Sequence, residues 1–243
     1  MDLKTIQAVE LAGGIGILTL NRPERRNALS IEMRREILGC MKAWRESPSI
    51  GVMIITGAGD AFSAGFDLTE FSRPELFSEL FETSSAYHRD LWYFPKPTMA
   101  AVNGPALAGG FDLAKLCDIR ICSPKAVFGH PEIKFGIPPL LTPLRWIVGE
   151  GLARHLCFTG KRVDAVEACR IGLVSEVVEG EKLLERAVKI ATEILETPPA
   201  ALQRTKQLMI DASGLGFEES FCLEHDRVFQ EFLLKKASES AGK

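Results

Sequence analysis

The sequence predicts an α/β fold with parallel strands, followed by a helical C-terminal region. Three observations lead to this prediction. Short apolar runs that are rich in β-branched residues, typical of buried strands, recur through about residue 130. Segments with apolar residues at helical spacing separate these runs, and such alternation is typical of α/β folds. After Pro143 the pattern is mostly helical.

The first predicted elements are a strand, a helix and a second strand. Residues 14–21 form an apolar run that ends at the turn signal Asn-Arg-Pro. Ser30 is a typical N-cap, and apolar residues at helical spacing come after it until Pro48. Residues 50–56 form a continuous apolar run, which predicts a strand buried on both faces.

Further elements continue the same alternation. Pro74 opens a second helix, and the glycine-rich stretch 104–120 supplies a loop and a third helix. The remaining strands are expected at 96–104, 118–123 and 126–129. The later helices are expected at 144–159, 164–171, 181–196, 199–212 and 217–236. We therefore predict an α/β core over residues 1–195 and a helical region over residues 196–243.

Composition narrows the classes of partner. The chain has 243 residues, of which 46% are hydrophobic, enough for a large core. Its formal net charge of -3 makes nucleic acid a poor candidate partner. No apolar run approaches the ~20 residues that span a bilayer, and the N-terminus does not resemble a signal peptide. We expect a cytoplasmic protein with no membrane partner.

The cysteines do not indicate a metal site. Six of them are scattered along the chain, without a CxxC pair and without a cysteine/histidine cluster at metal-ligand spacing. In a chain of this length they are typical of reduced core residues in a cytosolic protein. We therefore expect no bound metal.

Two glycine-bearing loops each come after a predicted buried strand. The first contains AFSAGFDL (61–68), and the second contains ALAGGFDL (106–113). Open α/β folds place ligands where such strands end. Glycine lets the backbone approach a ligand, and a free amide at a helix N-terminus carries partial positive charge. Two converging amides would stabilise an oxyanion.

Three other interpretations of these loops compete with an oxyanion site. The stretch GAGDAF (57–62) is close to a dinucleotide fingerprint, but Phe62 stands where Gly or Ala is expected. The stretch AFSAG (61–65) resembles a nucleophile elbow whose first glycine is replaced, and no compelling Asp-then-His order comes after it. Close packing of helix on strand, without any ligand, is the third interpretation.

Four stretches resemble the enoyl-CoA hydratase/isomerase (crotonase) superfamily. They are LNRPERRNALS (20–30), AFSAGFDL (61–68), residues 101–139 and residues 151–178, and they cover nearly the whole chain in order. The resemblance implies a crotonase-like spiral of ββα units with C-terminal helices that build a homotrimer or a hexamer. It also implies an acyl-CoA thioester substrate. Coenzyme A belongs to that substrate, so no separate cofactor is expected.

The resemblance assigns an oxyanion hole and two carboxylates. The backbone amides of Phe66 and Gly109 would bind the thioester carbonyl as it gains enolate character. Asp112 and Glu132 fall on the positions of the two catalytic glutamates of the hydratases. Asp112 is one methylene shorter than the hydratase glutamate, and such a displacement can affect the rate greatly. Without the resemblance, Asp112 would be assigned to helix first-turn electrostatics and Glu132 to a loop surface charge.

These residues leave three functions open. The first is syn addition of water to a 2-enoyl-CoA by both carboxylates. The second is double-bond isomerisation with Glu132 as the proton shuttle, although dienoyl-CoA isomerases have a further aspartate where this chain has Leu140. The third is a catalytically silent binding or assembly protein.

The resemblance also assigns contacts to coenzyme A and to the acyl group. Three phenylalanines, Phe71, Phe77 and Phe81, could line the acyl pocket, whereas their periodicity alone predicts ordinary core residues. The residues expected to bind coenzyme A or substrate are Arg26, Ala28, Ala64, Asp67, Leu68 and Gly110.

Overall fold

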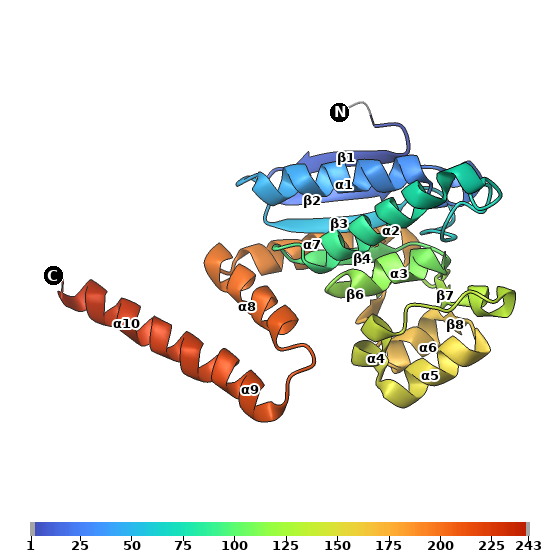
Figure 1. Ribbon diagram of the computed structural model, residues 1–243. Helices are drawn as coiled ribbons and strands as arrows, with labels where there is room; N and C mark the ends of the chain where they lie inside the picture. The colour runs from blue at the N-terminus through green and yellow to red at the C-terminus, as the bar shows by residue number, and fades with distance from the viewer. Residues whose placement is uncertain (1–2, 242–243) are drawn as a thin grey trace. The chain divides into compact units, whose positions relative to one another are not determined.

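The computed structural model describes residues 3–241, and the chain divides into two compact units. The first unit ends at Thr197 and contains every strand, whereas the second begins at Pro198 and is helical. Figure 1 shows the first unit from blue through green and yellow to the orange of its last helix, and the second unit from orange to red.

The main sheet has six strands in the order β1-β2-β3-β4-β6-β9. β1 pairs with β2 antiparallel, and each later neighbour pairs parallel. The parallel strands confirm the predicted α/β class. The strand bounds are β1 (Ile6–Leu11), β2 (Ile15–Leu20), β3 (Val52–Gly57), β4 (Thr98–Val102), β6 (Ile119–Cys122) and β9 (Glu176–Val177).

Helices cover both faces of this sheet. On one face, α1 (Ile31–Glu46) and α2 (Phe77–Trp92) pack over strand residues such as Ile55 (Figure 1). On the other face, α7 (Leu183–Leu195) packs over Ile54 and its neighbours. The continuous apolar run at β3 is therefore buried on both sides, as its sequence predicted.

A second, smaller sheet carries the segments around the site. Its strands are β5 (Ala106–Leu107), β7 (Val127–Gly129) and β8 (Val163–Asp164). β5 leads directly into α3 (Gly109–Leu116), a short helix whose residues are all buried. The remaining helices of the first unit are α4 (Thr142–Val148), α5 (Glu150–Thr159) and α6 (Ala165–Arg170), and its 3-10 segments are η1 (Pro23–Arg25), η2 (Pro74–Leu76), η3 (Pro131–Phe135) and η4 (Gly180–Lys182).

The structure confirms some predicted boundaries and corrects others. The Ser30 hydroxyl accepts a hydrogen bond from the Met33 amide, so the predicted N-cap is present. The single helix expected over 144–159 is instead two helices, because Gly149 has a φ of 82° that a continuous helix does not allow. β1 was not predicted, since four of its six residues are exposed and it lacks an apolar run.

The second unit consists of helices and one π-helical turn. It contains α8 (Pro199–Asp211), α9 (Phe217–Phe221), the π-helical turn Cys222–Arg227 and α10 (Val228–Ala241), in place of the single helix expected over 217–236. Four aromatic rings stack in series from α9 to the start of α10: Phe217, Phe221, His225 and Phe229. Among the described residues, no helix combines the length and apolar character that crossing a membrane requires.

Candidate active site

A cavity of about 1230 Å³ lies in the first unit. Four segments bound it: the loop from Ala64 to Phe71, helix α2, the start of α3 and residues 131–140. Its wall is largely apolar, and the carboxylates of Asp112 and Glu132 lie close to each other in this wall. Ligand pockets commonly combine an apolar wall with a few placed polar groups in this way.

The two glycine-bearing loops meet at this cavity. Ser63 and Ala106 form an isolated parallel bridge, and the Leu107 amide donates to the Ser63 carbonyl at 3.0 Å. A Cβ added to Gly65 would lie only 3.0 Å from the Gly109 amide nitrogen. Standard bond lengths then place the amide nitrogens of Phe66 and Gly109 within about 6 Å of each other.

Both amides are available to a ligand. In the part of the chain that the structure describes, neither Phe66 N–H nor Gly109 N–H donates a hydrogen bond to the protein. The first bond of α3 runs from the Asp112 amide to the Ala108 carbonyl, so Gly109 belongs to the unpaired first turn. Both residues line the cavity. This geometry can hold an oxyanion between two main-chain donors.

Ala108 sets the entry into α3, and sequence reasoning did not identify it. Its φ of 49° and ψ of −125° lie in a region that residues with a Cβ rarely adopt. Such strain costs about 1–3 kcal/mol, and it is typical of functional sites. The Ala108 amide donates to the Gly129 carbonyl at 2.9 Å, which anchors the strained residue to β7.

The glycines on either side of this junction serve packing. A Cβ at Gly110 would lie 2.3 Å from the Ser63 carbonyl oxygen, closer than any real contact. Gly65 has a φ of 96° and would meet Ala108 at 2.9 Å. The structure therefore places Gly110, expected to bind substrate, against Ser63, while its neighbour Gly109 lines the cavity.

The two predicted carboxylates come together. Asp112 lies in the first turn of α3 and is 8% exposed, and Glu132 lies in the 3-10 helix Pro131–Phe135. One carboxylate oxygen of each residue and a ring nitrogen of His130 lie within 4.8 Å of one another. Both carboxylates line the cavity, Asp112 from the same helix as Gly109 and Glu132 from the separate segment Pro131–Phe135.

A buried lysine and a histidine connect these carboxylates. Lys115 Nζ lies 2.8 Å from Asp112 Oδ1 and 2.9 Å from His130 Nε2. His130 Nδ1 lies 2.7 Å from Glu132 Oε1. The Lys115–Asp112 contact is an ion pair whose angles do not form a hydrogen bond, and Glu132 Oε2 is buried without a partner in the described residues.

This constellation also bears on metal binding. Asp112, His130 and Glu132 together offer three atoms that could ligate a cation. The Lys115 ammonium already contacts two of these groups, Asp112 and His130, so it stands where a cation would. The sequence held a signal for Lys115, since it lies one turn after Asp112 in an otherwise apolar helix. His130 was not assigned a role from the sequence.

The residues expected to bind coenzyme A cluster beside the first loop. The Ala64 amide donates to the Arg26 carbonyl at 2.9 Å, and the exposed Leu68 lines the cavity together with Ala64. Arg22, which sequence reasoning missed, donates to the Ala28 carbonyl and to Asp67 Oδ2, each at 2.9 Å. Its guanidinium thereby ties the segment before α1 to the first loop.

The Asp67 side chain has a structural role. Burial raises the pKa of Asp67, but hydrogen bonds from Thr69 and Arg22 outweigh it and hold this pKa below its ordinary value. Only the backbone of Asp67 is therefore available for the coenzyme A contact expected from the sequence.

Aromatic side chains also line the cavity. Phe71, Phe77 and Phe81 are 42%, 51% and 73% exposed and line the cavity, so they are not the core residues that their periodicity indicated. The Phe66 ring packs 4.8 Å from the buried Arg34 guanidinium, which fixes this ring at the cavity wall.

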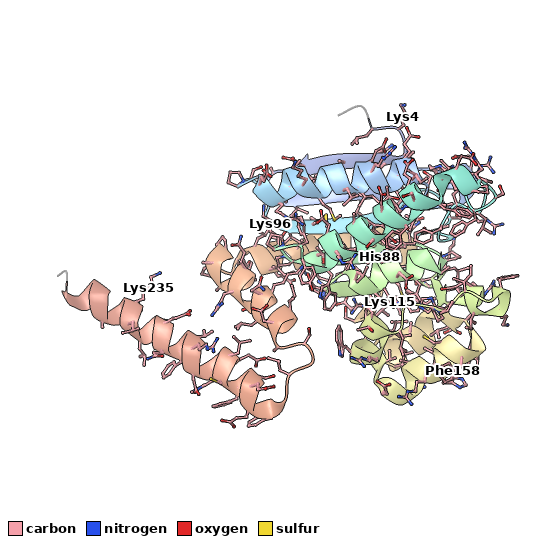
Figure 2. All side chains as sticks on the ribbon, in the orientation of Figure 1. Lys4, His88, Lys96, Lys115, Phe158 and Lys235 are labelled. Carbon is pink, nitrogen blue, oxygen red and sulfur yellow. The ribbon has the colours of Figure 1, made fainter. Side chains whose placement is uncertain are left out.

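Helices α2 and α3 pack side by side at the site, and Figure 2 labels His88 on the first and Lys115 on the second. His88 lines the cavity and its Nδ1 lies 2.7 Å from the Ser84 carbonyl oxygen. Burial lowers the pKa of His88. A neutral imidazole therefore borders the cavity on the α2 side.

Comparisons with known proteins agree with this geometry. Residues 10–241 match the family model described as enoyl-CoA hydratase/isomerase. A putative enoyl-CoA hydratase of Thermus thermophilus is 38% identical over 219 residues, covering 87% of this chain and 86% of the relative. A probable mitochondrial enoyl-CoA hydratase of Dictyostelium discoideum is 40% identical, covering 88% and 79%.

A solved structure supports the fold over its full length. The crystal structure of an enoyl-CoA hydratase subunit from Geobacillus kaustophilus superposes with a TM-score of 0.88 at 32% identity. The match covers 100% of this chain and 95% of that chain. These matches extend over both the α/β unit and the helical unit. The chain belongs to the enoyl-CoA hydratase/isomerase family.

Proposed function

We propose that this protein is an enoyl-CoA hydratase, which adds water to the double bond of a 2-enoyl-CoA thioester. One observation carries the proposal: two carboxylates, with oxygens within 4.8 Å, line a cavity that also presents two unpaired main-chain amides. One water molecule spans such a gap, at about 2.8 Å from each carboxylate oxygen. The named hydratases among the relatives support the same activity.

Each part of the site has a task in this reaction. The thioester carbonyl would accept hydrogen bonds from the amides of Phe66 and Gly109. A carboxylate takes a proton from the bound water while the water oxygen bonds to the β-carbon. The electrons of the double bond move onto the carbonyl oxygen as an enolate, which the two amides stabilise. The carboxyl group that took this proton then gives it to the α-carbon, where the enolate electrons form the new C–H bond, and both carboxyl groups are back in their starting state.

The remaining parts of the substrate would occupy the other walls. Backbone groups near Ala28, Ala64, Asp67 and Leu68, with the Arg26 side chain, would bind coenzyme A. The acyl group would lie against Phe71, Phe77 and Phe81. The proposal also includes a cytoplasmic location and assembly into a trimer or hexamer. The exposed aromatic residues of α9 and α10 support such an assembly.

Hydration of crotonyl-CoA, monitored by loss of the enoyl absorbance, tests this function. We expect turnover by the wild-type protein and a loss of about 10² to 10⁴-fold in kcat for Glu132→Gln, because the amide cannot transfer the proton. Thermal melting of both proteins controls for folding. Unchanged activity in the Glu132→Gln variant would contradict the assignment.

Double-bond isomerisation is the second candidate, and one observation favours it. The Asp112 carboxylate pairs with the Lys115 ammonium, whereas the Glu132 carboxylate contacts the His130 imidazole rather than a lysine or an arginine. Glu132 alone could then move a proton between the two carbons of a 3-enoyl-CoA. Formation of 2-enoyl-CoA from 3-enoyl-CoA, without hydration of crotonyl-CoA, would select this candidate. Absence of both reactions would leave a binding protein.

A further inference from the structure

Lys115 is almost completely buried, at 1% exposure, and does not line the cavity. An ammonium group has three N–H donors and no acceptor. Three groups surround this one: Asp112 Oδ1 at 2.8 Å, His130 Nε2 at 2.9 Å and the Leu140 carbonyl oxygen at 2.5 Å. His130 and the Leu140 carbonyl lie at hydrogen-bond distance and the Asp112 carboxylate pairs with the positive charge, so the surroundings suit a charged ammonium.

The donor-only chemistry of Lys115 fixes the state of His130. Because the ammonium can only donate, His130 Nε2 must accept, so the imidazole is neutral and carries its proton on Nδ1. His130 Nδ1 lies 2.7 Å from Glu132 Oε1 and therefore donates to it. The Phe111 ring packs against the imidazole at a tilt of 39°, with ring centroids 4.8 Å apart, and helps to hold it in place.

The same chain of contacts orients Glu132. Its Oε1 is occupied by His130, and its Oε2 is buried and unpartnered in the described part of the chain. Glu132 lines the cavity, so the unoccupied oxygen is the one left for a substrate or water. Lys115 acts at the same time on Asp112, whose charge it balances.

We propose that Lys115 is a positioning residue that couples the two carboxylates of the site. Through its ammonium it holds Asp112 directly, and through the tautomer of His130 it presents a single oxygen of Glu132 to the reacting water. This inference rests on the proposed function for its effect on turnover. Its effect on the His130 tautomer holds whether or not the protein hydrates crotonyl-CoA.

Nitrogen NMR of the wild-type protein, labelled with ¹⁵N in its four histidines, tests the tautomer without any change at Lys115. The His130→Phe spectrum identifies the resonances of His130. We expect a neutral ring with its proton on Nδ1 and a bare Nε2. A proton on Nε2, or on both nitrogens, would overturn the proposal. This measurement separates a failure of the inference from a failure of the hydratase assignment.

Kinetics of Lys115→Met test the effect on turnover. Methionine keeps the length of the side chain and removes its donors. We expect kcat for crotonyl-CoA to fall by at least about tenfold, because a misplaced catalytic group loses rate steeply, while KM changes less than about threefold. The double variant with His130→Phe should be only slightly slower than Lys115→Met alone, since the action of Lys115 on Glu132 already runs through His130.

Lys96→Met is the matched control. Lys96 is also a buried lysine, donating to the carbonyls of Trp44 and Ser47, but it does not line the cavity. The Lys96→Met variant should have a lower Tm and an unchanged kcat. If Lys115→Met likewise lowers Tm with an unchanged kcat, Lys115 is only structural and the proposal fails. If Lys115→Met does not fold, the NMR measurement of the His130 tautomer in the wild-type protein decides whether the proposal holds.

Discussion

The tetrapeptide Gly-Phe-Asp-Leu occurs twice in this chain, at 65–68 and at 110–113, and the two copies have different roles. In the first copy, Phe66 and the exposed Leu68 line the cavity, and Asp67 pairs with Arg22. In the second copy, Phe111 and Leu113 are buried in the core, and Asp112 lines the cavity.

The backbone conformation of each copy explains the difference. The first copy continues into a turn, so its phenylalanine amide remains unpaired and its leucine stays in solvent. The second copy lies within α3, whose residues are all buried: Phe111 and Leu113 belong to the core, and Asp112 lines the cavity. Identical local sequence thus places an unpaired main-chain amide at the cavity in one copy and a carboxylate at the cavity in the other.

The largest expected contrast is between the two aspartates. Asp112→Asn should lower kcat for crotonyl-CoA by about 10² to 10⁴-fold if both carboxylates handle the water. Asp67→Asn, the matched change in the first copy, should leave kcat nearly unchanged because the Asp67 side chain contacts Arg22 and Thr69 rather than the reacting groups. Equal effects of the two changes on kcat would remove the distinction between the copies.

The next contrast concerns the backbone amide at the start of α3. Gly109→Pro removes this amide at the first helical position. Because proline also restricts the residue before it, here the strained Ala108, thermal melting must show that the variant keeps its fold. Loss of one oxyanion donor should reduce kcat by about 10² to 10³-fold. Gly109→Ala keeps the amide and meets Phe66 Cε1 at 3.3 Å, so a much smaller fall is expected. Similar kcat values for the two variants would argue against a role for this amide.

The sequence predicted the residues that line the cavity better than the residues that hold them in place. Repeated glycines after buried strands located both loops, and the family resemblance located Asp112 and Glu132. The Lys115–His130 connection could not be predicted, because it joins a helix to a loop whose distance the sequence does not state. Arg22 was missed for the same reason, since its partner Asp67 is 45 positions away.

The fold shows the same division. Buried strands with continuous apolar runs were predicted, because burial on both faces leaves a clear pattern. β1 was not predicted, since its mostly exposed edge position leaves little apolar signal. β5, β8 and β9 have only two residues each, too few for a periodic pattern.

The smallest expected effect is on stability, at Asp67. Because the pKa of Asp67 is lowered in the folded protein, its stabilisation is present above the ordinary value near 3.8 and is lost as pH falls through the lowered value. Asp67→Asn should reduce the free energy of unfolding by about 1–3 kcal/mol at pH 7. Urea denaturation should show this deficit shrinking below about pH 4. A deficit that is constant with pH would contradict the ionic role of Asp67.

The claim that the thioester carbonyl binds between the amides of Phe66 and Gly109 can be measured on the bound ligand. Butyryl-CoA labelled with ¹³C at its carbonyl has no double bond to hydrate, and infrared difference spectroscopy reports its C=O stretch. The two hydrogen bonds predict a lower stretching frequency in the complex than in water, and a smaller decrease with Gly109→Pro. A frequency in the bound wild-type complex equal to that in water would contradict the account.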